Sequence, residues 1–383
     1  MKNTRMGSKG FGRFVVVLGT LSLGLLVTGC DEDTVPVDAG TDAGMDAGTD
    51  AGTDAGVACT DLPHDPKLGT LQLQTGFAAA ETAALPEGIG SVTAIQSGPE
   101  FKLYGLRGTD LYELGTWPNV ALGTAALQST IAEPDRAGTT YPNGYLTNDG
   151  TRVLSGYTKP GPLTNTPGMV LVYDTRTPAN SQYVSAPGNF TAAGLSGSFL
   201  INGQGIEGSN ESGNAVYALK TETSPFQGSR FATFPESGLY SGYTAVATNG
   251  VAVLGYSDSA FTNHLRAMAP ALYTPALSGG TTLALSDSNA PEIYSGDLAE
   301  ITAFGEGVAL HRTNFPNTRD VSRIALTVGG TDAKVVTAGT LESVLTTSNT
   351  CTNVVTMSPL GADLLVGVKD KNGRRLVRLQ VQP

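Results

Sequence analysis

The sequence is poor in the side chains that catalysis and metal binding use most often. Its 383 residues include three histidines, three cysteines and one tryptophan. His64, His264 and His311 lie far apart, and no histidine–cysteine pair has the spacing of a zinc site. The chain has no Gly-x-Ser-x-Gly motif and no local motif for a serine–histidine–aspartate triad. The sequence therefore predicts no metal site, and it leaves catalytic activity uncertain while favouring its absence.

Positive charge is also scarce. The chain carries 34 acidic and 23 basic residues, for a formal net charge of −11 at pH 7. Four of the basic residues fall within the first thirteen positions, so the chain beyond them is more acidic still. Such a charge balance does not attract nucleic acid or an anionic membrane face. We expect no nucleic-acid partner.

The N-terminus combines a basic segment with an apolar run. Residues 1–13 contain no acid, and residues 14–29 are apolar or small, a run too short to span a bilayer comfortably. The run ends in Val27-Thr28-Gly29-Cys30, which resembles the bacterial lipobox. The resemblance implies a lipoprotein signal peptide over residues 1–29 and lipidation of Cys30 by diacylglycerol and a further acyl chain such as palmitate. The alternative is an uncleaved membrane anchor with a chance cysteine.

An acidic low-complexity segment follows. Residues 31–56 contain eight acids, no base and five Asp-Ala-Gly repeats, so the segment buries too little apolar surface to order itself. We predict a disordered tether over residues 30–58. It resembles the tethers of surface lipoproteins in gliding, predatory Gram-negative bacteria. This resemblance implies a location in the cell envelope, where the lipid attaches the protein to a membrane. The outer membrane is favoured over the inner one. Asp31 resembles an inner-membrane retention signal, so the choice of membrane and leaflet stays open.

Residues 59–383 form the predicted folded domain. The 49 glycines and 21 prolines of the chain, with abundant threonine, serine and valine, argue against a helical protein and favour an all-β fold. With Cys30 assigned to lipidation, Cys59 and Cys351 are the two remaining cysteines. Disulfides persist in exported proteins. We predict a disulfide bond between these two cysteines.

A repeat organises the predicted domain. Six segments each show a strand, a glycine turn and a second apolar strand, and the turn glycines are Gly98, Gly150, Gly197, Gly250, Gly305 and Gly361. The intervals between them are 52, 47, 53, 55 and 56 residues. Asp149-Gly150 and Asn249-Gly250 are strong two-residue hairpin signals. A third strand follows in every unit and a fourth in five of them, with the segment from Thr281 as the fourth strand of the fourth unit.

The sixth unit lacks a fourth strand, and an unpaired strand from Gly69 precedes the first. This arrangement predicts a β-propeller of six four-stranded blades, closed by its N-terminal strand. Seven blades, with a further one hidden between Thr116 and Tyr141, and an array of β-sandwiches are the alternatives. The segment Val170–Thr175 resembles the third strand of surface-layer and YVTN-type propellers.

The longer predicted loops follow second and fourth strands, so they emerge on one face of the propeller. Because ligand groups usually sit on loops held by a rigid scaffold, this face is the candidate binding surface. Its aromatic, acidic and basic residues suit carbohydrate or another polar polymer. The candidate residues are Tyr141, Tyr240, Asp258, Tyr294, Asp297 and Arg319.

The predicted function is a lipid-anchored, non-catalytic binding module for a polysaccharide or an envelope protein, with no cofactor. One alternative is a calcium-dependent hydrolase resembling six-bladed lactonases, which hold calcium in the central channel. Another is a scaffold subunit of an envelope complex. Four or five carboxylates and amides around one channel mouth would favour the hydrolase, and a broad aromatic rim would favour the binding module.

Overall fold

The structure is a computed structural model that describes residues 58–108, 110–123, 141–158, 168–186, 190–204, 214–221, 227–234, 240–260, 262–314 and 318–382. The predicted signal peptide, Cys30 and the tether before residue 58 lie outside this part of the chain, and the lipidation of Cys30 stays a prediction. Residues 57–383 form one compact unit. Within the described residues, no helix has the length and apolar character needed to cross a membrane.

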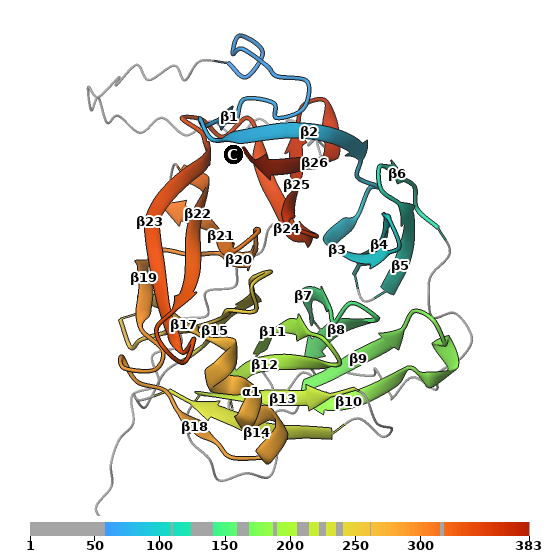
Figure 1. Cartoon of the computed structure of the whole chain (residues 1–383). Helices are drawn as coiled ribbons and strands as arrows, with labels where there is room; N and C mark the ends of the chain where they lie inside the picture. Colours follow the sequence, from blue (N-terminus) through green and yellow to red (C-terminus); the bar gives the residue numbers. More distant parts are fainter. Residues whose placement is uncertain are drawn as a thin grey trace, which may run out of the picture. The chain divides into compact units, whose positions relative to one another are not determined.

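The unit is a β-propeller of six blades, as predicted. Each blade is an antiparallel sheet whose first strand lies nearest the centre of the ring (Figure 1). Blades 1 to 3, from the inner strand outward, are β3 (Ile89–Ser97), β4 (Glu100–Arg107), β5 (Asp110–Thr116) and β6 (Asn119–Val120); β7 (Tyr141–Asn148), β8 (Arg152–Thr158), β9 (Gly168–Asp174) and β10 (Gln182–Ala186); and β11 (Phe190–Leu195), β12 (Ser198–Gln204), β13 (Asn214–Lys220) and β14 (Gln227–Thr233).

Blades 4 to 6 complete the ring in the same order. They are β15 (Tyr240–Val246), β16 (Ala252–Ser257), β17 (Asn263–Met268) and β19 (Glu292–Gly296); β20 (Glu300–Ala303), β21 (Gly307–Asn314), β22 (Thr318–Gly329) and β23 (Val335–Thr346); and β24 (Asn353–Leu360), β25 (Asp363–Asp370), β26 (Gly373–Val381) and the N-terminal β2 (Phe77–Ala84). A short 3-10 helix, Pro178–Asn180, precedes β10.

The six marker glycines lie where the repeat predicts them, in the turns between the first and second strands. All six have positive φ, from 60° at Gly305 to 88° at Gly150. A side chain strains this conformation, so glycine is the favoured residue there. The sequence interval between these glycines therefore reports the blade repeat directly.

The core is divided among the interfaces between blades. Six clusters of buried apolar residues are present, and each contains residues of two neighbouring blades. The cluster between blades 1 and 2, for example, joins Ile95, Tyr104 and Leu111 to Val153 and Leu171. Because every blade buries both of its faces in this way, the ring depends on its closure.

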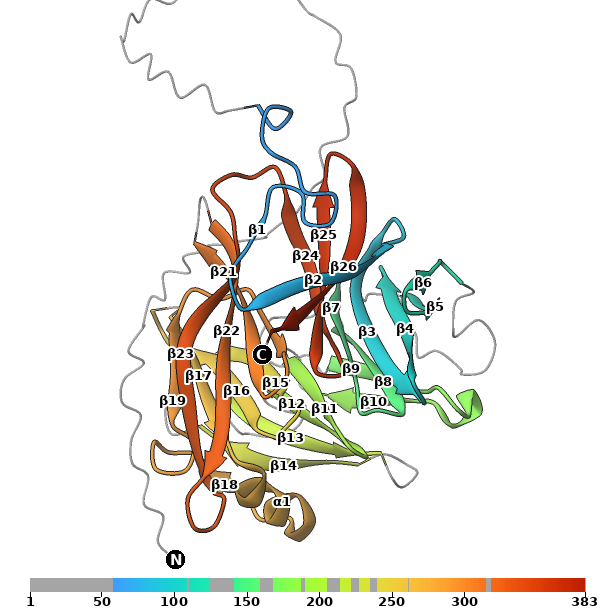
Figure 2. The ribbon, with the colours of Figure 1, turned by 45° about the horizontal axis from the view of Figure 1, so that its top comes forward.

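The N-terminal strand closes the ring, but its position differs from the prediction. The segment from Gly69 was expected to complete the last blade, whereas β2 does so by pairing with β26. The earlier segment supplies only β1 (Gln72–Leu73), which pairs with β23 as a fifth strand of blade 5. The N-terminal segment therefore contributes a strand to both blades that flank the closing seam (Figure 2).

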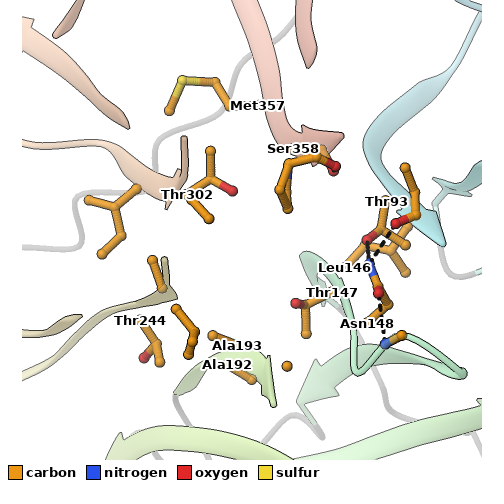
Figure 3. A pocket seen from close by; sticks show the side chains of 18 of the residues that line it. Thr93, Leu146, Thr147, Asn148, Ala192, Ala193, Thr244, Thr302, Met357 and Ser358 are labelled. Carbon is orange, nitrogen blue, oxygen red and sulfur yellow. Dashed lines mark hydrogen bonds between the residues drawn. The ribbon is translucent and has the colours of Figure 1, made fainter. Parts of the chain in front are cut away.

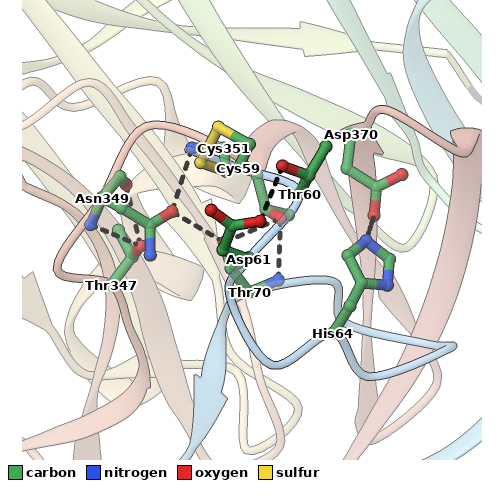
Figure 4. Close-up of a disulfide and its surroundings, with 10 residues drawn as sticks. Cys59, Thr60, Asp61, His64, Thr70, Thr347, Asn349, Cys351 and Asp370 are labelled. Carbon is green, nitrogen blue, oxygen red and sulfur yellow. Dashed lines mark hydrogen bonds and ion pairs between the residues drawn. A yellow bond between two sulfur atoms is a disulfide. The ribbon is translucent and has the colours of Figure 1, made fainter. Parts of the chain in front are cut away.

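The predicted disulfide is present at this seam. Cys59 and Cys351 are bonded, with 5.5 Å between their Cα atoms (Figure 4). Nearby, the backbone N–H of Thr70 donates to the Thr352 hydroxyl at 2.8 Å, and the Thr70 hydroxyl donates to Asn349 Oδ1 at 2.8 Å. Together with the disulfide, these bonds hold residues 59–70, which we call the entry segment, against the loop that connects blades 5 and 6.

Blade 4 departs from the prediction in its outer strand. The segment from Thr281 yields β18 (Leu283–Ala284), which pairs in parallel with β14 at the edge of blade 3. The helix α1 (Pro270–Gly279) precedes it, with proline in its first turn and Gly280 as a left-handed C-cap. Tyr273 and Ala276 of α1 enter the core between blades 3 and 4. The fourth strand of blade 4 is β19, in a stretch predicted to be a loop.

Candidate functional site

The inner strands of all six blades line the central channel. In each blade the inner strand runs from what we call the loop end, where the connection from the previous blade enters, to the turn end, where the glycine turn lies. The channel contains two cavities, of about 250 Å³ nearer the turn end and about 330 Å³ nearer the loop end. We call them the turn-end cavity and the loop-end cavity.

Hydroxyl groups dominate the polar lining of the turn-end cavity (Figure 3). Its threonine and serine residues come from five different blades and are Thr93, Thr147, Thr244, Thr302 and Ser358. Gln96 and Asn148 add two amides. These hydroxyl and amide groups both donate and accept hydrogen bonds without carrying charge, so they are suited to the hydroxyl groups of a ligand.

Asn148 shows how part of this lining is held in place. Its amide Nδ2 donates to the Thr93 hydroxyl at 2.7 Å and to the Ala94 carbonyl at 3.1 Å, across the interface between blades 1 and 2. Its Oδ1 accepts the backbone N–H of Gly150 at 3.0 Å. These bonds orient the amide toward the seam between blades.

The loop-end cavity has more ionisable groups. Glu300, His311 and Tyr243 line it together with Ser91, Thr191 and Thr356. The Tyr243 hydroxyl donates to the Leu298 carbonyl at 2.6 Å, and burial raises the pKa of Tyr243 to about 12. Tyr243 is therefore a neutral group that joins blades 4 and 5 at the channel wall.

Glu300 occupies the place where the two cavities meet. It lines both, as do Leu146, Thr244, Ile301 and Met357. Burial raises the pKa of the Glu300 carboxyl to about 7, and a hydrogen bond from the backbone N–H of Met357 opposes part of that rise. His311 lies opposite Glu300 in the β20–β21 register. The channel thus holds a carboxyl group that changes charge near neutral pH.

The described lining differs from the set expected for a calcium-binding channel. Among the residues that line the two cavities, Glu300 is the one carboxylate, and Gln96 and Asn148 are the two amide side chains. The calcium alternative predicts four or five such groups at one mouth. The described residues also contain no cluster of three or more histidine, cysteine, aspartate or glutamate side chains that could hold a metal ion.

Of the six predicted surface residues, Asp258, Tyr294 and Asp297 do not line either cavity. By topology, Tyr141 and Tyr240 begin inner strands, Asp258 follows β16, Asp297 follows β19 and Arg319 is near the start of β22, so all five stand at the loop end of their blades. The side chains of Tyr141, Tyr240 and Arg319 lie outside the described part. Tyr294 lies within β19 rather than in a loop, and its hydroxyl donates to the Asp297 carbonyl at 2.9 Å.

Asp258 belongs to a second polar group, on blade 4. Its carboxylate accepts the backbone N–H groups of Ala260 and Thr262, both at 2.9 Å, and lies 3.4 Å from Nε2 of His264. The Thr262 bond is the main cause that lowers the pKa of Asp258. Nδ1 of His264 lies 2.9 Å from Glu292, and the ring stacks on Tyr256. The polar atoms of Asp258 and His264 therefore make their contacts within blade 4.

Sequence reasoning missed Glu300. The candidate binding residues were placed on the longer loops, and acids within the inner strands were not considered. The available signal was an acid directly before an inner strand that otherwise carries small and apolar residues. His311, one of the three histidines, also lines the loop-end cavity.

Comparisons with known proteins concern the fold. No protein-family model matches the chain, and no curated protein matches its sequence. Similar solved structures include the β-propeller domain of Cps50 (Swd1) from Myceliophteria thermophila, at 9% identity and a TM-score of 0.43 over 79% of this chain and 100% of that one. The SapL1 lectin in complex with alpha methyl fucoside is 12% identical, with a TM-score of 0.38 over 74% and 88%. A glucose dehydrogenase is 11% identical, with a TM-score of 0.42 over 78% and 99%.

Proposed function

We propose that this protein is a lipid-anchored binding module of the bacterial cell envelope that binds a carbohydrate polymer at the loop end of its propeller and within the central channel. The hydroxyl-lined channel carries the proposal, because its threonine, serine and amide groups match the donors and acceptors of sugar hydroxyls. Apolar side chains of Leu146, Ile301 and Met357 lie beside them, as a ligand with both polar and apolar faces requires.

The anchoring part of the proposal rests on the lipobox-like residues ending at Cys30 and on the acidic tether that follows. Two acyl chains on Cys30 would retain the propeller at a membrane surface, since stable anchoring takes more than one lipid signal. The expected location is the outer membrane.

The anchoring test uses metabolic labelling with a clickable palmitate analogue. The full chain is expected to incorporate the label and to sediment with membranes, whereas Cys30→Ala loses the label and stays out of the lipoprotein fraction. The double variant Cys59→Ser, Cys351→Ser is the matched control, because it removes the two cysteines of the disulfide and leaves Cys30 in place. Equal labelling of Cys30→Ala and the unmodified sequence would contradict the anchor.

The binding test is the thermal unfolding of the full chain with calcium, with a chelator and with a panel of envelope polysaccharides. A ligand that binds only the folded form raises the melting temperature by mass action. A rise with polysaccharide is the expected result. A rise that needs calcium would instead favour the calcium-dependent hydrolase, and no rise in any condition would favour the scaffold subunit.

A further inference from the structure

We propose that Glu300 makes the central channel a site for a protonated primary amine carried by an amino sugar. The inference rests on the proposed carbohydrate-binding function and names the class of sugar. It concerns the residues at which the turn-end and loop-end cavities meet.

The first observation is that Glu300 has no lysine or arginine beside it in the described channel lining. Neither cavity has a lysine or an arginine among its described residues, and the carboxyl accepts a hydrogen bond from the Met357 backbone. Glu300 is half-buried, and a carboxylate that is partly withdrawn from water without a lysine or arginine beside it is costly, which its raised pKa reflects. A ligand that brings a positive charge to Glu300 would offset it.

The second observation is the chemistry around the carboxyl group. An ammonium group has three N–H donors and no acceptor, so it needs several oxygen atoms around it. Thr244 lines both cavities with Glu300, and Thr302 lines the turn-end cavity two residues along the same strand. One carboxylate with hydroxyl acceptors matches a primary ammonium, whereas calcium takes six to eight oxygen ligands. The described lining therefore favours an organic cation over a divalent metal ion.

The third observation is the character of the space on either side. The cavities of about 250 Å³ and about 330 Å³ offer hydroxyls for the remaining groups of a sugar ring and apolar contacts from Leu146 and Met357 for its C–H face. A simple alkylammonium would leave those hydroxyls without partners. This favours an amino sugar as the carrier of the ammonium group.

The titratable groups near Glu300 affect the pH at which the amine is expected to bind. His311 on β21 faces it across the β20–β21 register, and Tyr243 on β15 lines the same cavity. Tyr243 stays neutral because burial raises its pKa to about 12. Amine binding is expected to be strongest near pH 7, because Glu300 is protonated at lower pH and the ammonium group of an amino sugar loses its proton at higher pH.

The test compares three β-linked oligomers of the same length by isothermal titration of the full chain at pH 7, where Glu300 is partly charged and the amine of glucosamine keeps its proton. One consists of glucosamine, one of N-acetylglucosamine and one of glucose, so they differ only in an ammonium, an acetamide or a hydroxyl at one ring position. We expect the glucosamine oligomer to bind at least about tenfold more tightly than the other two, the effect of one charge-assisted hydrogen bond.

Glu300→Gln is the decisive variant because it keeps the shape of the side chain and removes its charge. It is expected to abolish the preference for glucosamine without weakening binding of the neutral oligomers. Glu306→Gln is the matched control, because Glu306 is exposed at the turn of the same blade and should leave the preference intact. Thermal melts of both variants without ligand show that each is folded.

The outcomes separate this inference from the proposed function. Equal binding of all three oligomers, or an unchanged preference in Glu300→Gln, overturns the amine site while carbohydrate binding stands. Tighter binding of spermidine or lysine amide than of the glucosamine oligomer overturns the amino sugar as the carrier. If no oligomer and no envelope polysaccharide binds, the proposed function fails as well.

Discussion

The carboxyl group of Glu300 on β20 accepts a hydrogen bond from the backbone N–H of Met357 on β24. This bond crosses the seam between blades 5 and 6, the same seam that the disulfide and the two N-terminal strands join. The channel carboxyl thus lies next to the interface at which the ring is closed. Its charge state is therefore expected to affect stability as well as binding.

The stability of the protein without ligand should fall as the pH rises between about 5 and about 7. The pKa of Glu300 is about 7 in the folded chain against an ordinary value of 4.5, so the folded state holds the proton longer than the unfolded state in this window. The stabilising effect is complete below the ordinary value and is lost above the folded value. Glu300→Gln should be more stable than the unmodified chain at pH 8, by up to about 3 kcal/mol.

Urea unfolding at several pH values measures this effect. The difference in unfolding free energy between Glu300→Gln and the unmodified chain should shrink toward zero near pH 5. Glu306→Gln again serves as the control, with a difference that does not depend on pH in this way. A constant difference between pH 5 and 8 for Glu300→Gln would contradict a raised pKa at this position.

Loss of the disulfide should destabilise the propeller at its closing seam. The bond joins residues 292 positions apart, so its removal frees a long loop in the unfolded chain. We expect the double variant Cys59→Ser, Cys351→Ser to lose about 2–5 kcal/mol of unfolding free energy. Reductant should lower the melting temperature of the unmodified chain and leave that of the double variant unchanged. Equal melting temperatures for the two proteins under oxidising conditions would count against this role.

Asp370, at the end of β25, has a buried carboxylate that contacts His64 of the entry segment. Its side chain is 1% exposed and contacts Arg375 at 2.6 Å. It also contacts His64 at 2.9 Å (Figure 4). Burial raises the pKa of Asp370, but the hydrogen bonds from Arg375 and the Asn372 backbone and the nearby charges of Arg375 and His64 together outweigh it, so the pKa lies below the ordinary 3.8. Asp370 therefore stabilises the fold above that ordinary value, and this contribution disappears as the pH falls through its folded pKa.

Asp370→Asn should cost about 3 kcal/mol or more, because it leaves the buried Arg375 guanidinium without its counter-charge. Chemical unfolding at neutral pH measures the loss. His64→Ala provides the comparison and should cost far less, since Arg375 still pairs with Asp370. Similar losses in the two variants would show that the histidine, and not the arginine pair, carries this contact.

Gly194→Ala should disrupt the packing of blade 3 on blade 2. A Cβ atom at this position would lie 1.5 Å from the backbone carbonyl oxygen of Asn148, which cannot withdraw as a side chain could. We expect a loss of about 1–3 kcal/mol or more. Gly329→Ala is the control, because a Cβ there meets nothing within 4 Å and the residue lies on an exposed strand. Unchanged melting temperatures for both variants would contradict the close approach of the two blades.

Most of the fold could be predicted because the blade repeat is a local property. Turns such as those at Gly150 and Gly250 need positive φ, and the strands on either side alternate within a few residues. The outer strands were less predictable. Leu283–Ala284 and Gln72–Leu73 pair with strands of a neighbouring blade, a choice that depends on which edge is free rather than on their own residues.

The candidate site was predicted only in part. Tyr294 was assigned to a surface loop, yet its hydroxyl bonds within its own blade at Asp297. Glu300 was overlooked, because nothing in the residues around it distinguishes an acid in a loop from an acid in a channel. The distinction requires the five other inner strands that enclose it.

The sequence by itself favoured six blades over seven, because the glycine-turn hairpins follow from residue type and order, and it predicted the disulfide between Cys59 and Cys351. Only the tertiary structure decided which N-terminal segment closes the ring and which carboxyl group lies inside it. Both depend on contacts between residues hundreds of positions apart, such as Phe77 with Val381, whose geometry exists only once the ring is complete.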